Sequence, residues 1–184
     1  MSEYYGVQRS EAYLKHYGVL GMKWGCHKAS GHTLFVSGSS KTQDKSSPYY
    51  QRKLPKDVRK GLKSSMKQHD KIIVGDAPGI DRQVQDYLKK KHYPDVEVYG
   101  PGKKVRYNAN SKWKVNPIDA PEYPEGSSEW LAKKDKAMTD RATKGMAIVL
   151  NEGSKATRNN IQRLKDQGKP SQVYTLFPKK KHRS

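Results

Sequence analysis

Residues 71–88, KIIVGDAPGIDRQVQDYL, decide the fold of this chain. The run Lys71–Val74 is apolar and β-branched, which is typical of a buried parallel strand. The residues that follow Gly79 carry apolar side chains at helical spacing. A strand, a glycine-containing turn and a helix therefore follow one another. This order brings backbone N–H groups and a helix N-terminus to the carboxyl end of a strand, where open α/β sheets bind anionic ligands.

The turn itself has two interpretations. Its residues Gly75, Asp76, Gly79 and Asp81 suit a turn that accepts a phosphate group. In the alternative, Gly79 only permits a tight turn and Asp81 only caps the helix. The turn alone does not distinguish a phosphate-binding role from a purely structural one, so the other loops of the chain have to be considered.

The same alternation of strand and helix continues along the chain. Strands are expected at 33–36, 71–75, 96–99, 145–150 and 172–177, and helices at 54–66, 82–91, 129–143 and 157–164. This pattern predicts an α/β, Rossmann-like parallel sheet of about five strands with flanking helices and right-handed crossovers. Residues 103–126 have no clear periodicity and contain three prolines, so we expect an irregular excursion that brings Arg106 to the ligand.

Two further strand-to-loop junctions contain small residues, as does the junction that follows the strand ending at Val74. Ser37, Gly38 and Ser39 follow the first strand, and Gly153 and Ser154 follow the strand that ends at Leu150. In a parallel sheet these three junctions lie at one edge, so they are expected to line one crevice. We expect Thr157 to cap the next helix and to face a phosphate. An ordinary capped loop is the alternative for this last junction.

Composition sets limits on the other parts of the chain. The chain has 184 residues, of which 33% are hydrophobic, and a formal charge of +19, so one moderate core with polar margins is expected. The excess of basic residues is compatible with binding to nucleic acid, and equally with a basic surface that is only solvated. Cys26 is the single cysteine, which fits a reducing compartment.

No leader and no membrane span are expected. No metal is expected either, because Cys26, His27 and His32 lack a second ligand pair.

The expected organisation has three parts. Residues 1–30 form a flexible arm, residues 31–177 a folded domain and residues 178–184 a basic tail. Within the arm, the segment HYGVLGMKWG at 16–25 resembles a segment that recurs in structural and virion-associated proteins of tailed bacteriophages and prophages. This resemblance implies phage origin, a location in the host cytoplasm or the virion, and docking of residues 13–25 to a phage structural protein. The predicted docking side chains are those of Tyr17, Leu20, Met22 and Trp24, unless the segment folds back onto the domain.

Residues 33–177 resemble the SLOG superfamily, which includes the LOG phosphoribohydrolases and DNA-processing protein A. The motifs are Pro78-Gly79-Ile80-Asp81, Lys134-Asp135-Lys136-Ala137-Met138 and Gly153-Ser154-Lys155-Ala156-Thr157. The resemblance implies a nucleotide-like ligand, and self-association, which is common among such relatives, is left open. No tightly held cofactor is expected. The residues predicted to bind the nucleotide are Ser37, Gly38, Ser39, Gly75, Asp76, Gly79, Asp81, Arg106, Lys134, Asp135, Gly153, Ser154 and Thr157.

Two departures from the LOG pattern bear on catalysis. Asn160 stands where those enzymes carry the catalytic glutamate, and Lys134 replaces an arginine. Asp81 and Glu152 remain as candidate acids or bases. The first functional hypothesis is therefore a phage-encoded nucleotide-binding protein, virion-associated or acting against host defence. The alternatives are a nucleotide N-glycosidic hydrolase and a nucleic-acid-binding protein related in fold to DNA-processing protein A, and whether the protein is an enzyme stays open.

Overall fold

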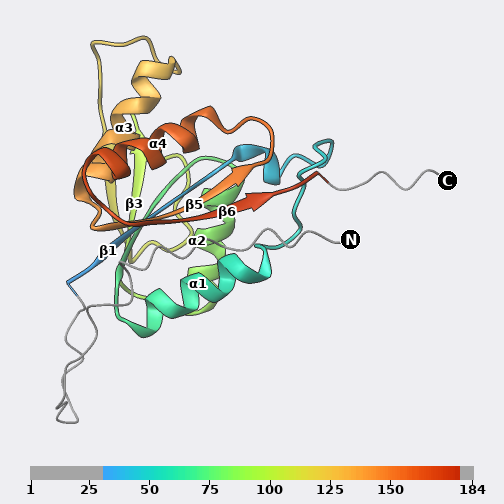
Figure 1. The fold of residues 1–184 in the computed structure, drawn as a ribbon. Coiled ribbons are helices and arrows are strands. Elements are labelled where there is room, and N and C mark those ends of the chain that lie inside the picture. The colour runs from blue at the N-terminus through green and yellow to red at the C-terminus, as the bar shows by residue number, and fades with distance from the viewer. Residues whose placement is uncertain (1–30, 179–184) are drawn as a thin grey trace.

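The computed structural model describes residues 31–178, which form a six-stranded sheet with helices on both faces (Figure 1). The strand order is β4-β3-β2-β1-β5-β6, and every neighbouring pair is parallel. The strands are β1 Thr33–Gly38, β2 Lys71–Gly75, β3 Val96–Pro101, β4 Lys114–Ile118, β5 Lys144–Leu150 and β6 Ser171–Leu176. The Rossmann-like α/β fold expected from the sequence is thus confirmed.

Each face of the sheet is covered by one pair of helices (Figure 1). Helices α1 Lys56–Lys67 and α2 Ile80–Lys90 cover one face, and α3 Ser128–Arg141 and α4 Lys155–Asp166 cover the other. Along β1, Leu34 and Val36 belong to the core under α1 and α2, while Phe35 belongs to the core under α3 and α4. This alternation follows from the two-residue repeat of a strand, and burial on both faces explains why the central strands are continuously apolar.

The strand order reverses beside β1. From β1 the chain proceeds through β2 and β3 to β4 on one side, and then crosses to β5 and β6 on the other side of β1. Because all strands are parallel, the loops that follow β1, β2 and β5 leave the sheet at the same carboxyl edge. Such a reversal is the usual place of a ligand crevice in open α/β sheets. The expected position of these three junctions at one edge of the sheet is therefore confirmed, and the crevice that they are expected to line stays a prediction.

Strand β4 is missing from the sequence-based expectation, which had five strands and an irregular excursion over 103–126. It lies at the edge of the sheet, pairs only with β3, and includes Pro117 opposite Gly100. Its burial is low, and Val115 is 44% exposed. A polar edge strand with a proline gives no apolar run, which is why its sequence did not indicate a strand.

The other differences are small. Helix α1 begins one residue after Pro55, with Leu54 buried just before it, and Trp113 of the excursion is buried in the core under α2. The expected flexible arm 1–30, its docking segment and nearly all of the basic tail lie outside the described residues. Within residues 31–178, the helices are all too short or too polar to cross a bilayer.

Gln85 attaches the excursion to helix α2. Its side chain is fully buried. The Gln85 Nε2 group donates to the carbonyl of Gly75 at 2.8 Å, and Oε1 accepts from the Ala109 N–H at 2.9 Å. These bonds join the end of β2 to the chain just beyond Arg106.

We predict that Gln85→Leu lowers the free energy of unfolding by about 2–3 kcal/mol, because it leaves the buried Gly75 carbonyl and the partly buried Ala109 N–H without these partners. Chemical denaturation of the purified variant measures the change. Gln162→Leu on the exposed side of α4 is the matched control and should shift stability by less than about 0.5 kcal/mol. Equal stabilities of the two variants would contradict this role of Gln85.

Candidate functional site

A network of polar side chains lies at the carboxyl edge of the sheet, and we call it the edge network. Its members come from β1, from the chain after β2, from the excursion after β3, and from α2, α3 and α4. They are Ser37, Asp76, Asp81, Arg106, Lys134, Asp135, Asn160 and Arg163. Most of these side chains are buried, which is unusual for charged groups unless they are paired or functional.

Two glycines at strand ends make room for the carboxylates. A Cβ atom at Gly75 would overlap Oδ2 of Asp81 and lie 2.9 Å from Nζ of Lys134. A Cβ atom at Gly100 would lie 2.5 Å from Oδ2 of Asp76. The ends of β2 and β3 therefore require glycine because charged side chains lie across them.

Asp76 is held by the excursion. It is fully buried and accepts two hydrogen bonds from the Arg106 guanidinium, at 2.6 Å and 3.1 Å, and one from the Arg106 backbone N–H at 2.8 Å. This planar, two-point geometry is the one that arginine provides and lysine does not. The Arg106 side chain keeps 44% of its surface exposed, so its outer side is accessible to solvent.

Asp81 has a strongly shifted acidity. Burial raises the pKa of its carboxyl group to about 7, with a smaller upward contribution from the charge of Asp135, while Lys134 opposes the shift. It accepts a hydrogen bond from the Ala77 N–H at 3.3 Å. Asp81 is therefore present in both protonated and ionised forms near neutral pH, a property that clusters at functional sites.

Lys134 remains a cation between the two acids. Burial lowers its pKa, but the charges of Asp135 and Asp81 outweigh burial and leave the pKa above its ordinary value. Nζ of Lys134 lies 3.2 Å from Oδ1 of Asp135. The three residues predicted here from the sequence, Asp81, Lys134 and Asp135, are thus brought together by the fold.

Asn160 joins α4 to the network. Its Nδ2 group donates to Ser37 Oγ at 3.1 Å and to Asp135 Oδ2 at 3.2 Å, and its Oδ1 atom accepts from Arg163 Nη1 at 2.7 Å. The sequence had drawn attention to Asn160 only as a missing glutamate, and Arg163 was not predicted at all. Their spacing of three residues on one helix face was the available signal.

The turn after Pro78 contacts protein rather than open space. Gly79 is the N-cap of α2 with φ of 87°, its N–H donates to Gln43 Oε1 at 2.8 Å, and the Ile80 N–H donates to the Ser39 carbonyl at 3.2 Å. A Cβ atom at Gly79 would overlap the backbone of Ser39 and Ser40. Asp81 lies in the first turn of α2 and is not its cap, so the capping interpretation of Asp81 was wrong.

Gly38 and Ser39 also serve the packing of the β1 loop against α2. A Cβ atom at Gly38 would lie 2.5 Å from the Cβ atom of Ile80. The Ser39 hydroxyl caps the short helix η2 Ser40–Thr42 by accepting from the Lys41 N–H at 3.2 Å. These two predicted ligand residues therefore serve the packing and capping of the β1 loop, whereas Ser37 belongs to the edge network.

The loop after β5 is open. Gly153 has φ of 92°, and a Cβ atom added to it would meet no atom of the described residues within 4 Å. Glu152 is exposed and lies outside the edge network. The N-cap of α4 is Ser154 in the left-handed conformation, and its hydroxyl accepts from the Leu150 N–H at 3.0 Å. Thr157 lies inside α4 and is 3% exposed, so the predicted cap at Thr157 was wrong.

Within residues 31–178, the side chains of His, Cys, Asp and Glu do not gather in groups of three or more that could hold a metal ion. Cys26 and His27 lie outside that range.

A family model described as a family of unknown function, DUF7211, matches residues 7–31. No curated protein matches the chain. The matched residues contain the predicted docking side chains Tyr17, Leu20, Met22 and Trp24, and the match ends where the described structure begins.

The acidity of Asp81 makes a prediction about stability. Its pKa in the folded chain, about 7, lies above the ordinary value of 3.8, so the folded state binds more protons between these values. Stability is then lost as pH rises from about 4 to 7. We predict that Asp81→Asn, which stays neutral, is more stable than the wild type by roughly 2–4 kcal/mol at pH 8, with the difference shrinking toward pH 4.

Thermal and denaturant unfolding at pH 4.5, 6, 7 and 8 measures this difference. Asp119→Asn, an exposed acid outside the network, is the control and should show a pH-independent difference near zero. An Asp81→Asn effect that is equal at pH 4.5 and pH 8 would contradict the raised pKa.

Proposed function

We propose that the carboxyl edge of the sheet binds a nucleotide or a nucleotide-derived ligand. The observation that carries this proposal is the edge network, in which buried charged groups from separate elements meet beside the reversal of strand order. Burying so many ionisable groups is costly unless they are used, and this edge is where open α/β sheets bind ligands.

The accessible groups at this edge have the right chemistry. The Asp135 side chain is 15% exposed and offers carboxylate oxygens, which suit ribose hydroxyl groups. The exposed side of Arg106 and the exposed Lys155 at the start of α4 offer positive charge for phosphate groups. The open turn at Gly153 leaves space for a ligand to approach the N-terminus of α4.

The resemblance of residues 33–177 to the SLOG superfamily supports the same ligand class. The phage-type segment at 16–25 supports a phage-encoded protein, and we extend the proposal to a virion-associated or counter-defence role in which residues 13–25 dock to a phage structural protein. The family match to residues 7–31 supports the view that this segment is a unit separate from the domain.

Hydrolysis of an N-glycosidic bond is the second candidate, and the raised pKa of Asp81 favours it. In this reaction water would add to C1′ of the ribose while the bond to the base breaks. Asp81 would protonate the departing base and regain its proton from the attacking water. Glu152, the other predicted acid, is exposed and outside the network, so Asp81 is the better donor.

Nucleotide binding is tested by incubating the full chain with a panel of nucleoside mono-, di- and triphosphates and dinucleotides. Mass spectrometry of the bound and free fractions then identifies both the retained ligand and any product. We predict that at least one nucleotide is retained, and that Asp135→Asn weakens its binding about tenfold or more through loss of a charged hydrogen bond.

Asp140→Asn is the matched control, because Asp140 lies on the same helix but is exposed and pairs with Lys136. It should leave the affinity unchanged. Retention of intact nucleotide supports binding alone, and release of free base that stops in Asp81→Asn supports hydrolysis. Failure of the whole panel to bind, or equal affinities of the two α3 variants, would contradict the proposal.

A further inference from the structure

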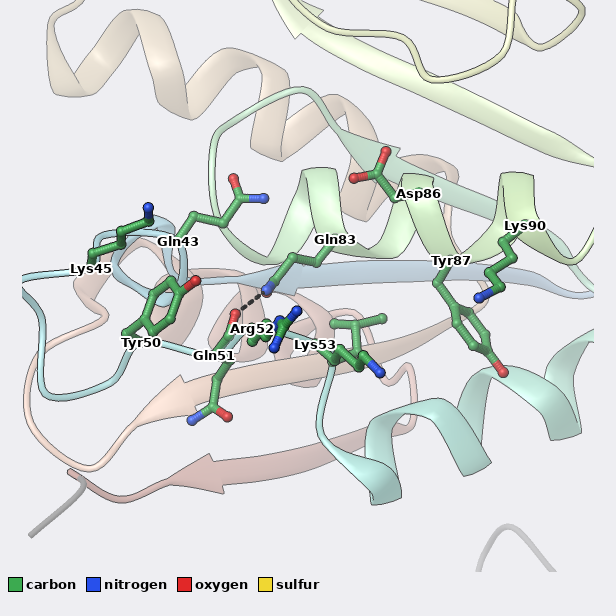
Figure 2. A pocket seen from close by; sticks show the side chains of 11 residues that line it. Gln43, Lys45, Tyr50, Gln51, Arg52, Lys53, Gln83, Asp86, Tyr87 and Lys90 are labelled. Carbon is green, nitrogen blue, oxygen red and sulfur yellow. Dashed lines mark hydrogen bonds between the residues drawn. The ribbon is translucent and has the colours of Figure 1, made fainter.

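A hollow lies along the outer side of α2, and we call it the α2 groove. It has a volume of about 510 Å³, within the range of small-molecule sites. Its walls are the loop between η2 and α1 on one side and α2 on the other (Figure 2). The lining residues are Gln43, Lys45, Tyr50, Gln51, Arg52, Lys53, Leu54, Gln83, Asp86, Tyr87 and Lys90.

The charge of the α2 groove is strongly positive. Lys45, Arg52, Lys53 and Lys90 are all exposed, and within residues 31–178 none of these four forms an ion pair. The one carboxylate among the lining residues, Asp86, already accepts a hydrogen bond from the Tyr107 hydroxyl. Four cations against one engaged carboxylate favour an anionic occupant.

Two side chains that line the groove, those of Gln83 and Tyr87, carry polar atoms without partners among the described residues. Gln83 is 9% exposed, and its Nε2 group donates to the Gln51 carbonyl at 2.6 Å, but its Oε1 atom is buried with no hydrogen-bond partner. Figure 2 shows this side chain reaching from α2 to the opposite loop. The hydroxyl of Tyr87 is also buried without a partner among the described residues, but it points toward α1 (Figure 2). Burial raises the pKa of Tyr87, with the charge of Arg59 opposing, so this hydroxyl stays neutral and can donate.

Unpartnered buried polar atoms are rare in folded proteins, because each costs about 1–3 kcal/mol unless something satisfies it. The buried Gln83 oxygen lacks a donor, such as a hydroxyl or amino group, and the four exposed cations favour an anion. Two tyrosine rings, Tyr50 and Tyr87, supply flat walls. A phosphate ester that also carries hydroxyl or amino groups meets all of these requirements.

From this geometry we propose that the α2 groove is a binding site for a phosphate-bearing small molecule, with Arg52, Lys53 and Lys90 contacting the phosphate and Gln83 Oε1 accepting from a hydroxyl or amino group of the same molecule. The site is distinct from the edge network. Gln43, which lines the groove, accepts a hydrogen bond from the Gly79 N–H at the start of α2.

The test is a residue-resolved NMR titration of the ¹⁵N-labelled full chain with inorganic pyrophosphate, glucose 6-phosphate and 5′-AMP. The expected result is saturable shifts of the Gln83 side-chain amide and of the Arg52 and Lys53 backbone amides. The double variant Arg52→Gln/Lys53→Gln should weaken binding about tenfold or more. Lys60→Gln/Lys63→Gln, with the same charge change on the exposed side of α1, should change it less than about twofold.

Lys90→Gln provides a second variant on the opposite wall and should also weaken binding if the double variant does not fold. Linear shifts without saturation, or equal losses in the two double variants, would show diffuse electrostatic attraction and overturn the proposal. Shifts confined to Asp135 and Asn160 would also overturn it, while supporting ligand binding at the edge network instead.

Discussion

The contact of two charged side chains, those of Asp81 and Lys134, with the backbone of Gly75 determines how the helices are placed around the end of β2. The carboxylate of Asp81 and the ammonium group of Lys134 lie where a side chain at position 75 would be. This arrangement fixes α2 and α3 at the end of the same central strand, although the two helices cover opposite faces of the sheet. Once Lys134 is placed, Asp135 reaches Asn160, and Asn160 reaches Ser37 at the end of β1.

The two buried acids next to β2 are stabilised to different degrees. Asp76 has three hydrogen bonds from Arg106, which offset the cost of burying its charge. Asp81 has the Ala77 N–H and the charge of Lys134, and its pKa still rises to about 7. A carboxyl group that the fold holds at the expense of stability is more typical of a functional site than of a structural ion pair. This contrast directs attention to Asp81 rather than to Asp76.

Much of the fold could be predicted because the central strands are buried on both faces and appear in the sequence as β-branched runs, as in Ile72–Val74. β4 could not, because an exposed edge strand with Pro117 lacks that signal. The convergence of Asp81, Lys134 and Asp135 was anticipated through the family resemblance. The contributions of Asn160 and Arg163 depend on how α4 packs beside α3, which local sequence patterns do not specify.

The surroundings of the turn at Gly79 also depend on tertiary packing that the local sequence does not specify. Gly79 was expected to leave its backbone open to a ligand, but the loop after β1 packs against it and uses the N–H groups of Gly79 and Ile80. The need for glycine was recognised correctly, and its physical reason depended on a loop that is distant in the chain. In the same way, the hollow along α2 is formed by the loop between η2 and α1 together with one side of the helix, which no single segment reveals.

Nucleotide binding at the carboxyl edge of the sheet is tested most directly by a crystal structure of the full chain. The crystals are grown with the nucleotide that binds most tightly, or with a mixture of mononucleotides at saturating concentration. We expect electron density for the nucleotide at the carboxyl edge, with ligand atoms within hydrogen-bond distance of Asp135 or Arg106. A ligand bound only elsewhere, or an edge that stays empty although it is accessible in the crystal, would contradict it.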